Sequence, residues 1–138
     1  MSTAIEQSVE ARLIAAMPPT PIISAKLQYN QVDPFAVRMT FPAPATLADE
    51  DVCWTFAREL LASGLDRPVG EGDIQVRPYG YDCTVLELHA PVGTAVLHVH
   101  SSDIRCFLEL TAALVPVGLE HLHLDLDHGL RELMRGTS

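Results

Sequence analysis

Residues 73–100 read DIQVRPYGYDCTVLELHAPVGTAVLHVH, and this stretch decides the expected fold. Three strand-like runs, 73–78, 83–89 and 94–100, are separated by short segments that contain Gly, Pro or Asp, the residues that dominate turns. Connections of this length join neighbouring antiparallel strands into hairpins. The stretch therefore predicts three consecutive antiparallel strands.

The N-terminal part of the chain extends this pattern. Residues 35–41, FAVRMTF, alternate between the two faces of a predicted strand, and one face carries Phe35, Val37, Met39 and Phe41. Residues 22–30 and 8–17 are interpreted as two further strands, because Pro18–Pro21 break any regular element between them and Asp33-Pro34 is typical of a turn.

The clearest predicted helix covers residues 52–63. Three acidic residues, Asp49-Glu50-Asp51, precede it, where the helix dipole favours negative charge. Its apolar stripe at helical spacing consists of Cys53, Phe56, Ala57, Leu60 and Leu61. We expect Gly64 to end the helix in the left-handed conformation and residues 67–72 to form a loop.

Two more helices are expected towards the C-terminus. Ser101-Ser102-Asp103 is typical of a helix N-cap, and Val115–Gly118 ends that helix. Its buried face should contain Ile104, Phe107, Leu108 and either Thr111 or Leu114. A last short helix is expected from about Asp125. The sequence thus predicts an α+β fold: one domain over residues 1–138, with a core of about 8–134, built on antiparallel sheet with two to three helices.

Composition excludes several classes of protein. The 138 residues carry nine Lys and Arg against eighteen Asp and Glu, a net charge of −9. This balance argues against nucleic-acid binding, which requires clustered positive charge. No apolar run approaches the roughly 20 residues of a membrane span, and no secretory signal is visible, so we expect a cytoplasmic protein. Three separated cysteines, Cys53, Cys83 and Cys106, are expected to be reduced core residues.

A histidine-rich pattern near the C-terminus leaves a metal site open as an alternative. The candidate ligands, with a same-face pair on the preceding strand, are His98, His100, His121, His123 and Asp125. Zinc requires three or four converging ligands. The other interpretation is that Leu122, Leu124 and Leu126 bury one face while the polar residues face solvent or cap a helix. This interpretation is favoured, so no metal and no cofactor are expected.

No catalytic arrangement is recognisable. The chain contains no GxSxG elbow, Walker loop or dinucleotide fingerprint, and Ser101-Ser102 are better explained as caps than as nucleophiles. We therefore expect a protein that is not an enzyme. The sole tryptophan, Trp54, borders the apolar stripe of the predicted helix. It belongs either to a wide core face or to a subunit contact, because aromatic residues are enriched in interface cores.

The order of motifs resembles the SsgA-like family of sporulation and cell-division regulators of filamentous actinobacteria. The resemblance covers residues 8 to 134 and is carried by Asp33–Val37, Val52–Leu61, Gly64-Leu65, Arg67-Pro68, Gly70–Ile74, Pro91–Ala95, Val115–Gly118 and His121–Asp127. The helix-like Trp-x-Phe-Ala-Arg-x-Leu-Leu followed by Gly-Leu-x-Arg-Pro is fairly specific. Arg77 departs from the pattern, since many relatives have an aromatic residue before this proline.

The resemblance has functional implications. It implies a protein without enzymatic activity that localises to future septum sites and guides the tubulin-like division protein FtsZ, with one family paralogue recruiting another. It also implies a homotrimer whose fold is related to the whirly nucleic-acid-binding fold. Two alternatives stay open: a nucleic-acid-binding whirly-like protein, which the charge disfavours, and a small metalloenzyme that uses the histidine-rich segment.

Overall fold

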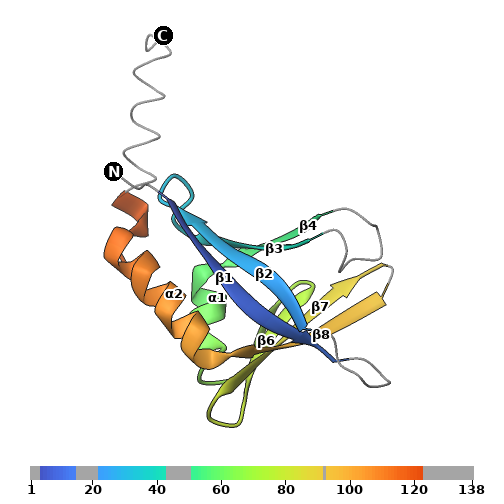
Figure 1. The fold of residues 1–138 in the computed structure, drawn as a ribbon. Helices are drawn as coiled ribbons and strands as arrows, with labels where there is room; N and C mark the ends of the chain where they lie inside the picture. The colour runs from blue at the N-terminus through green and yellow to red at the C-terminus, as the bar shows by residue number, and fades with distance from the viewer. Residues whose placement is uncertain (1–3, 15–21, 43–50, 92, 123–138) are drawn as a thin grey trace.

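A computed structural model describes residues 4–14, 22–42, 51–91 and 93–122 of the chain. The described part contains a sheet of eight strands and two helices of six or more residues (Figure 1). In chain order the elements are β1 (Ala4–Leu13), β2 (Ile22–Asn30), β3 (Ala36–Phe41), β4 (Val52–Ala57), α1 (Arg58–Ser63), β5 (Val69–Glu71), β6 (Ile74–Tyr79), β7 (Cys83–Ala90), β8 (Gly93–His100) and α2 (Ser101–Leu114).

The sheet is antiparallel throughout and curled around α1. Its strand order is β4-β3-β2-β1-β8-β7-β6-β5, so β4 and β5 form the two ends. Figure 1 shows α2 along one side of the curled sheet and α1 within it. The core lies between the sheet and α2, where Leu27, Met39, Leu86, Leu97 and Phe107 are almost fully buried. The prediction of an antiparallel sheet with few helices is therefore confirmed.

The strands of the N-terminal half follow the alternation in the sequence. Strand β2 covers the predicted residues 22–30, and Val37, Met39 and Phe41 of β3 are buried. Strand β1 begins four residues earlier than expected and pairs with β2 over Ala4–Arg12. Phe35, which was predicted to share the face of Val37, lies just before β3 and is 46% exposed.

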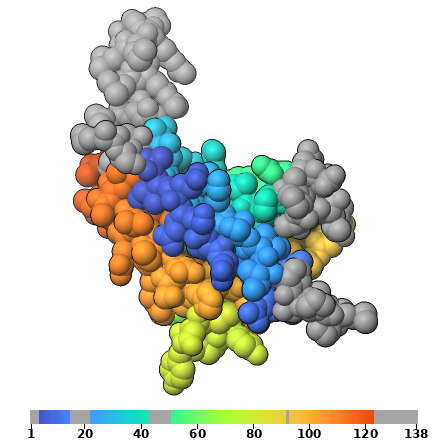
Figure 2. All heavy atoms as spheres, viewed as in Figure 1, coloured from blue at the N-terminus to red at the C-terminus, as the bar shows by residue number. Residues whose placement is uncertain are grey.

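The predicted hairpins of residues 73–100 are confirmed. Tyr79 pairs with Cys83 and Ala90 pairs with Gly93, which places β6, β7 and β8 side by side. Residues 67–72 are not entirely a loop, because Val69–Glu71 pairs with β6 as β5. Gly72, with a φ of 61°, makes the tight turn between these two strands. In Figure 2 the yellow-green atoms of the β6–β7 hairpin project beyond the surface of β1, β2 and α2.

The predicted helix over 52–63 is wrong in its first half. Residues 52–57 form strand β4, which pairs with β3 so that Trp54 lies opposite Met39. The side chains of this run are Val, Cys, Trp, Thr and Phe, which favour a pleated surface when a partner strand is available. The α1 helix therefore begins only at Arg58, and Cys53 faces solvent instead of sharing a stripe with Phe56.

Gly64 has a different role from the one expected. Its φ is −67°, so the residue is not in the left-handed conformation. A Cβ atom at this position would lie 2.2 Å from Cγ1 of Val76 on β6. Glycine is required because the end of α1 packs directly against the sheet.

Helix α2 confirms the predicted buried face but not the predicted cap. Ile104, Phe107 and Thr111 are buried, and the helix ends before Val115 as expected. The N-cap is His100, without a side-chain cap bond, and the Ser101 hydroxyl instead shares a 2.8 Å hydrogen bond with the Thr84 hydroxyl. The helix expected from Asp125 lies outside the described residues.

The cysteines correct another expectation. Cys53 and Cys106 are exposed and Cys83 is half-buried, so the three thiols are not core residues. In the two exposed cases the side chain lies on the solvent face of an element whose opposite face fills the core. Within the described ranges, no helix is long and apolar enough to cross a membrane.

Candidate interaction surfaces

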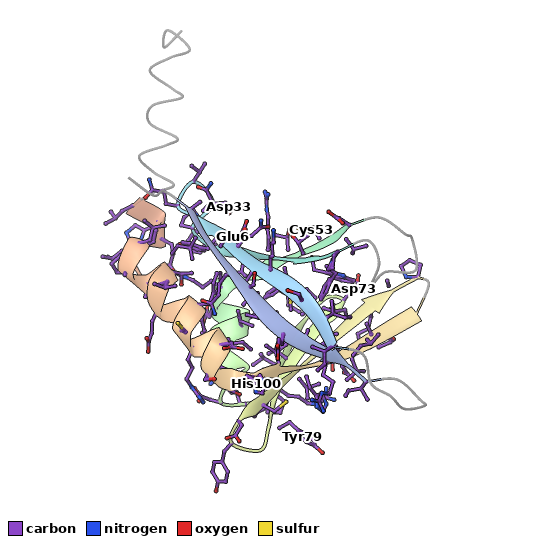
Figure 3. All side chains as sticks on the ribbon, viewed as in Figure 1. Glu6, Asp33, Cys53, Asp73, Tyr79 and His100 are labelled. Carbon is purple, nitrogen blue, oxygen red and sulfur yellow. The ribbon has the colours of Figure 1, made fainter. Side chains whose placement is uncertain are left out.

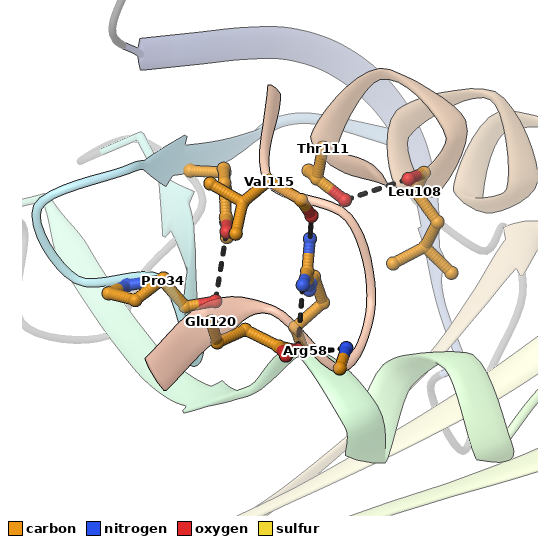
Figure 4. Close-up of polar contacts among 8 residues, drawn as sticks. Pro34, Arg58, Leu108, Thr111, Val115 and Glu120 are labelled. Carbon is orange, nitrogen blue, oxygen red and sulfur yellow. Dashed lines mark hydrogen bonds and ion pairs between the residues drawn. The ribbon is translucent and has the colours of Figure 1, made fainter. Parts of the chain in front are cut away.

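Arg58 is a buried charge at the start of α1. Its side chain is 4% exposed, and its Nη2 donates to a carboxylate oxygen of Glu120 at 2.7 Å (Figure 4). Its Nη1 donates to the carbonyl of Val115 at 2.8 Å, and its guanidinium lies 5.1 Å from the ring centre of Tyr29. A buried guanidinium is tolerated when its donors are paired in this way.

Two residues beside Arg58 have shifted pKa values. The hydrogen bond from Arg58 lowers the pKa of Glu120 below its usual value, and the backbone N–H of Gly118, 2.7 Å away, stabilises the carboxylate further. Burial raises the pKa of Tyr29, whose hydroxyl donates to the Pro34 carbonyl at 2.9 Å. The phenol therefore stays protonated and the carboxylate stays charged at neutral pH.

Arg58 thereby joins segments that are distant in the sequence. Its backbone N–H donates to the carbonyl of Phe35, and its side chain holds Val115 and Glu120. The joined segments expose large apolar side chains, and we call these residues the Arg58-joined surface: Phe35, Val117, Leu119 and Leu122. Val117 is 76% exposed. Exposed large apolar side chains, where they form a patch, are typical of protein-binding surfaces.

A second feature lies where the two ends of the sheet approach each other. A groove of about 290 Å³ lies between β4 and the β5–β6 turn, with α1 beside it. Its lining consists of Trp54, Thr55, Phe56, Ala57, Leu60, Glu71, Asp73 and Ile74. Figure 3 labels Cys53 on β4 and Asp73 in the β5–β6 turn, the two elements that border the groove. Both charged residues of the lining are acidic.

One edge of β4 faces this groove. Arg58 N–H donates to the Phe35 carbonyl at 2.7 Å, which continues the β3–β4 register by one pair. Hydrogen-bonded pairs alternate along an antiparallel ladder, so Trp54 and Phe56 bond to β3. The backbone groups of Cys53, Thr55 and Ala57 therefore point away from β3, and no described strand pairs with them.

Trp54 connects the groove to the core. Its side chain is half-buried, packs against the core cluster and also lines the groove. Sequence reasoning placed it on a helix, which is wrong, and the structure gives it a position on a sheet edge.

The candidate metal ligands lie on several elements. His98 and His100 share the outer face of β8, and the ring of His98 lies 5.2 Å from that of Tyr79. Burial, together with Arg77 and Arg12, lowers the pKa of His98. His121 is exposed beyond α2, and His123 and Asp125 lie outside the described residues. Among the residues that the structure describes, no three His, Cys, Asp or Glu side chains form a group suited to a metal ion.

The sequence did not predict that Arg58 is buried and joins distant segments, or that Glu71 and Asp73 line a groove. Val115 and Glu120 lie 57 and 62 positions after Arg58, so no local sequence pattern predicts these contacts. The alternation of Val52, Trp54 and Phe56 is a signal for a strand over this run, but it does not show that the strand lies at an edge.

Comparison with known proteins places this architecture in a family. The family model described as "Streptomyces sporulation and cell division protein, SsgA" matches residues 23–120. The chain belongs to the SsgA-like family. It is 39% identical over 137 residues to the sporulation-specific cell division protein SsgB of Streptomyces coelicolor, covering 97% of this chain and 98% of that one. SsgB of Kineococcus radiotolerans is also 39% identical, over 96% of this chain and 81% of the relative.

Solved structures of SsgA-like proteins share the fold. The SsgA-like sporulation-specific cell division protein from Thermobifida fusca superposes with a TM-score of 0.84 at 34% identity, covering 96% of this chain and 98% of that chain. A structure from work on SsgB mutations in Streptomyces coelicolor gives 0.78 at 37% identity, covering 88% and 95%. Several of these relatives are named SsgB. This name agrees with the SsgB branch of the family, which the chain resembles in its length and in the sequence of residues 121–127.

Proposed function

We propose that this SsgA-like protein is a non-catalytic regulator that helps to position or recruit FtsZ at sporulation septa. Family membership carries the proposal, because relatives that align over nearly the whole chain are named sporulation-specific cell division proteins. The second expected partner is a paralogue of the same family, and the place of action is the septum site in the cytoplasm.

The Arg58-joined surface is our candidate for the FtsZ contact. The net charge of −9 does not favour long-range attraction to an acidic partner, so a contact based on apolar side chains fits this chain better. Val117 and Leu119 are exposed on a segment that Arg58 holds in place through Val115 and Glu120. A prearranged apolar surface loses little conformational freedom on binding.

Co-sedimentation with polymerised FtsZ tests this contact. We expect the chain to pellet with the polymers, and the variants Val117→Ser and Leu119→Ser to weaken binding by about tenfold. Tyr81→Ser is the matched control, because Tyr81 is 95% exposed but lies on the distant β6–β7 hairpin. Absence of pelleting at any concentration, or equal losses in all three variants, would contradict the proposal.

We also propose that the chain assembles as a homotrimer and that its curled sheet is related to the whirly fold. Size-exclusion chromatography with light scattering should give the mass of three chains. A monomer at micromolar concentration would refute the trimer. The kinship with whirly proteins does not extend to their ligand in this proposal, since fold does not fix function and the charge balance repels phosphates.

A further inference from the structure

We propose that the free edge of β4 binds an extended, basic segment of a partner protein, which adds to the sheet as a further strand. The proposal does not rest on the FtsZ contact, which we place on the Arg58-joined surface. It follows from three properties of this edge: its backbone polarity, its side chains and the charge of the groove beside it.

The backbone of β4 is prepared for strand addition. Cys53 and Thr55 direct their N–H and C=O groups away from β3, and Ala57 directs its N–H away, as the 2.7 Å bond from Arg58 to Phe35 fixes the alternation. The Ala57 carbonyl lies at the N-cap of α1, where it accepts the first hydrogen bond of the helix. An edge of this kind is a template for another strand. Recognition by strand addition takes its affinity from these main-chain hydrogen bonds.

The side chains of β4 lack the usual protection of an edge. Natural edge strands carry charges, proline or bulges that discourage pairing. The six residues of β4 contain no charge and no proline, and its register with β3 runs without interruption over Val52–Ala57. The strand at the opposite end of the sheet, β5, is only three residues long, which is itself a common form of edge protection.

The groove determines the chemistry of the occupant. Trp54, Phe56, Leu60 and Ile74 give it an apolar lining, and Glu71 and Asp73 are the only charged residues among the lining residues that the structure describes. Both acidic residues are exposed. An apolar side chain of an added strand would lie on Trp54, and a Lys or Arg beside it would meet the acidic rim. A second copy of this chain fits less well, because its own Glu71 and Asp73 would add negative charge.

The sole tryptophan gives a direct test. Two short peptides of alternating valine and threonine, one with terminal lysines and one with terminal glutamates, are titrated into the whole chain while Trp54 emission is recorded. We expect the lysine peptide to shift the emission and to bind about tenfold more tightly than the glutamate peptide.

A proline variant tests the backbone contact. Thr55→Pro removes an N–H at the free edge, a position where proline is compatible with a strand. It should lower the affinity for the lysine peptide by about tenfold. Thr55→Val keeps the N–H and should lower this affinity far less. Thermal unfolding confirms that both variants are folded, and Glu71→Lys with Asp73→Lys should reverse the preference between the peptides.

Three results would overturn the proposal: no emission shift, equal affinity for both peptides, or equal binding by the proline and valine variants. A shift that appears when the chain alone is concentrated would assign the edge to a second copy and would also overturn it. None of these results bears on co-sedimentation with FtsZ, so the two proposals fail separately.

Discussion

The Arg58 junction and the β4 edge meet at Ala57 and Arg58, yet their polar groups are paired in one region and unpaired by any described strand in the other. At the junction a charge is buried, and its donors reach the Val115 carbonyl and the Glu120 carboxylate. Along β4, the outward groups of Cys53, Thr55 and Ala57 meet no described strand. The contrast indicates that the junction fixes the shape of the molecule, whereas the edge keeps hydrogen-bonding capacity for a partner.

The largest expected effect comes from removing the buried charge. Arg58→Ala leaves the Val115 carbonyl without its side-chain donor and the Glu120 carboxylate with only the Gly118 N–H, and we expect a loss of about 3–5 kcal/mol in the free energy of unfolding. Urea denaturation measures it. Arg105→Ala, at an exposed position on α2, is the control and should change stability by less than about 0.5 kcal/mol. Similar losses in both variants would show that the junction does not stabilise the fold.

The next effect concerns how α1 is held between the two ends of the sheet. Gly64→Ala would place a Cβ 2.2 Å from Cγ1 of Val76, and relieving this clash should cost about 1–3 kcal/mol. Gly70→Ala is the control, because its Cβ would meet only the flexible Gln75 side chain closely, at 3.1 Å. If the two variants melt at the same temperature, the close approach of α1 to β6 is wrong.

The pH dependence of stability gives a smaller effect with a defined sign. Arg58 lowers the pKa of Glu120 in the folded chain below 4.5, so the folded state binds the proton less readily than the unfolded state. The resulting stabilisation is complete above the unfolded pKa and is lost as pH falls through the folded pKa. We expect stability to decrease below about pH 5 and Glu120→Gln to flatten part of this decrease. An unchanged pH profile in the variant would separate Glu120 from the effect.

These contrasts also show which features sequence reasoning could predict. The hairpins of residues 73–100 depend on adjacent residues, namely turn chemistry and alternation, and their pairing was predictable. The run Val52–Ala57 fits both a helical stripe and an alternating strand, and pairing with β3 decides between them. Asp49-Glu50-Asp51 before this run favoured the prediction of a helix. Acidic residues stabilise the start of a helix, but they do not by themselves make the residues that follow helical.

Long-range contacts account for the rest. The Arg58–Glu120 pair joins residues 62 positions apart, so its existence depends on how the sheet curls and where α2 ends. Gly64 was predicted to adopt a positive φ, but the residue is glycine because any side chain here would collide with Val76 of β6. Family resemblance identified the kind of protein from the sequence, yet it did not locate the acidic groove, since that groove forms only when β4 and the β5–β6 turn approach each other.

Amide hydrogen exchange along β4, followed residue by residue by NMR in the chain alone, tests the central contrast most directly. The N–H groups of Trp54, Phe56 and Arg58 bond to β3 or its preceding turn and should exchange slowly. Those of Cys53, Thr55 and Ala57 should exchange much faster, in strict alternation with their neighbours. Uniform protection of all six amides would mean that the edge is already covered and would contradict the account.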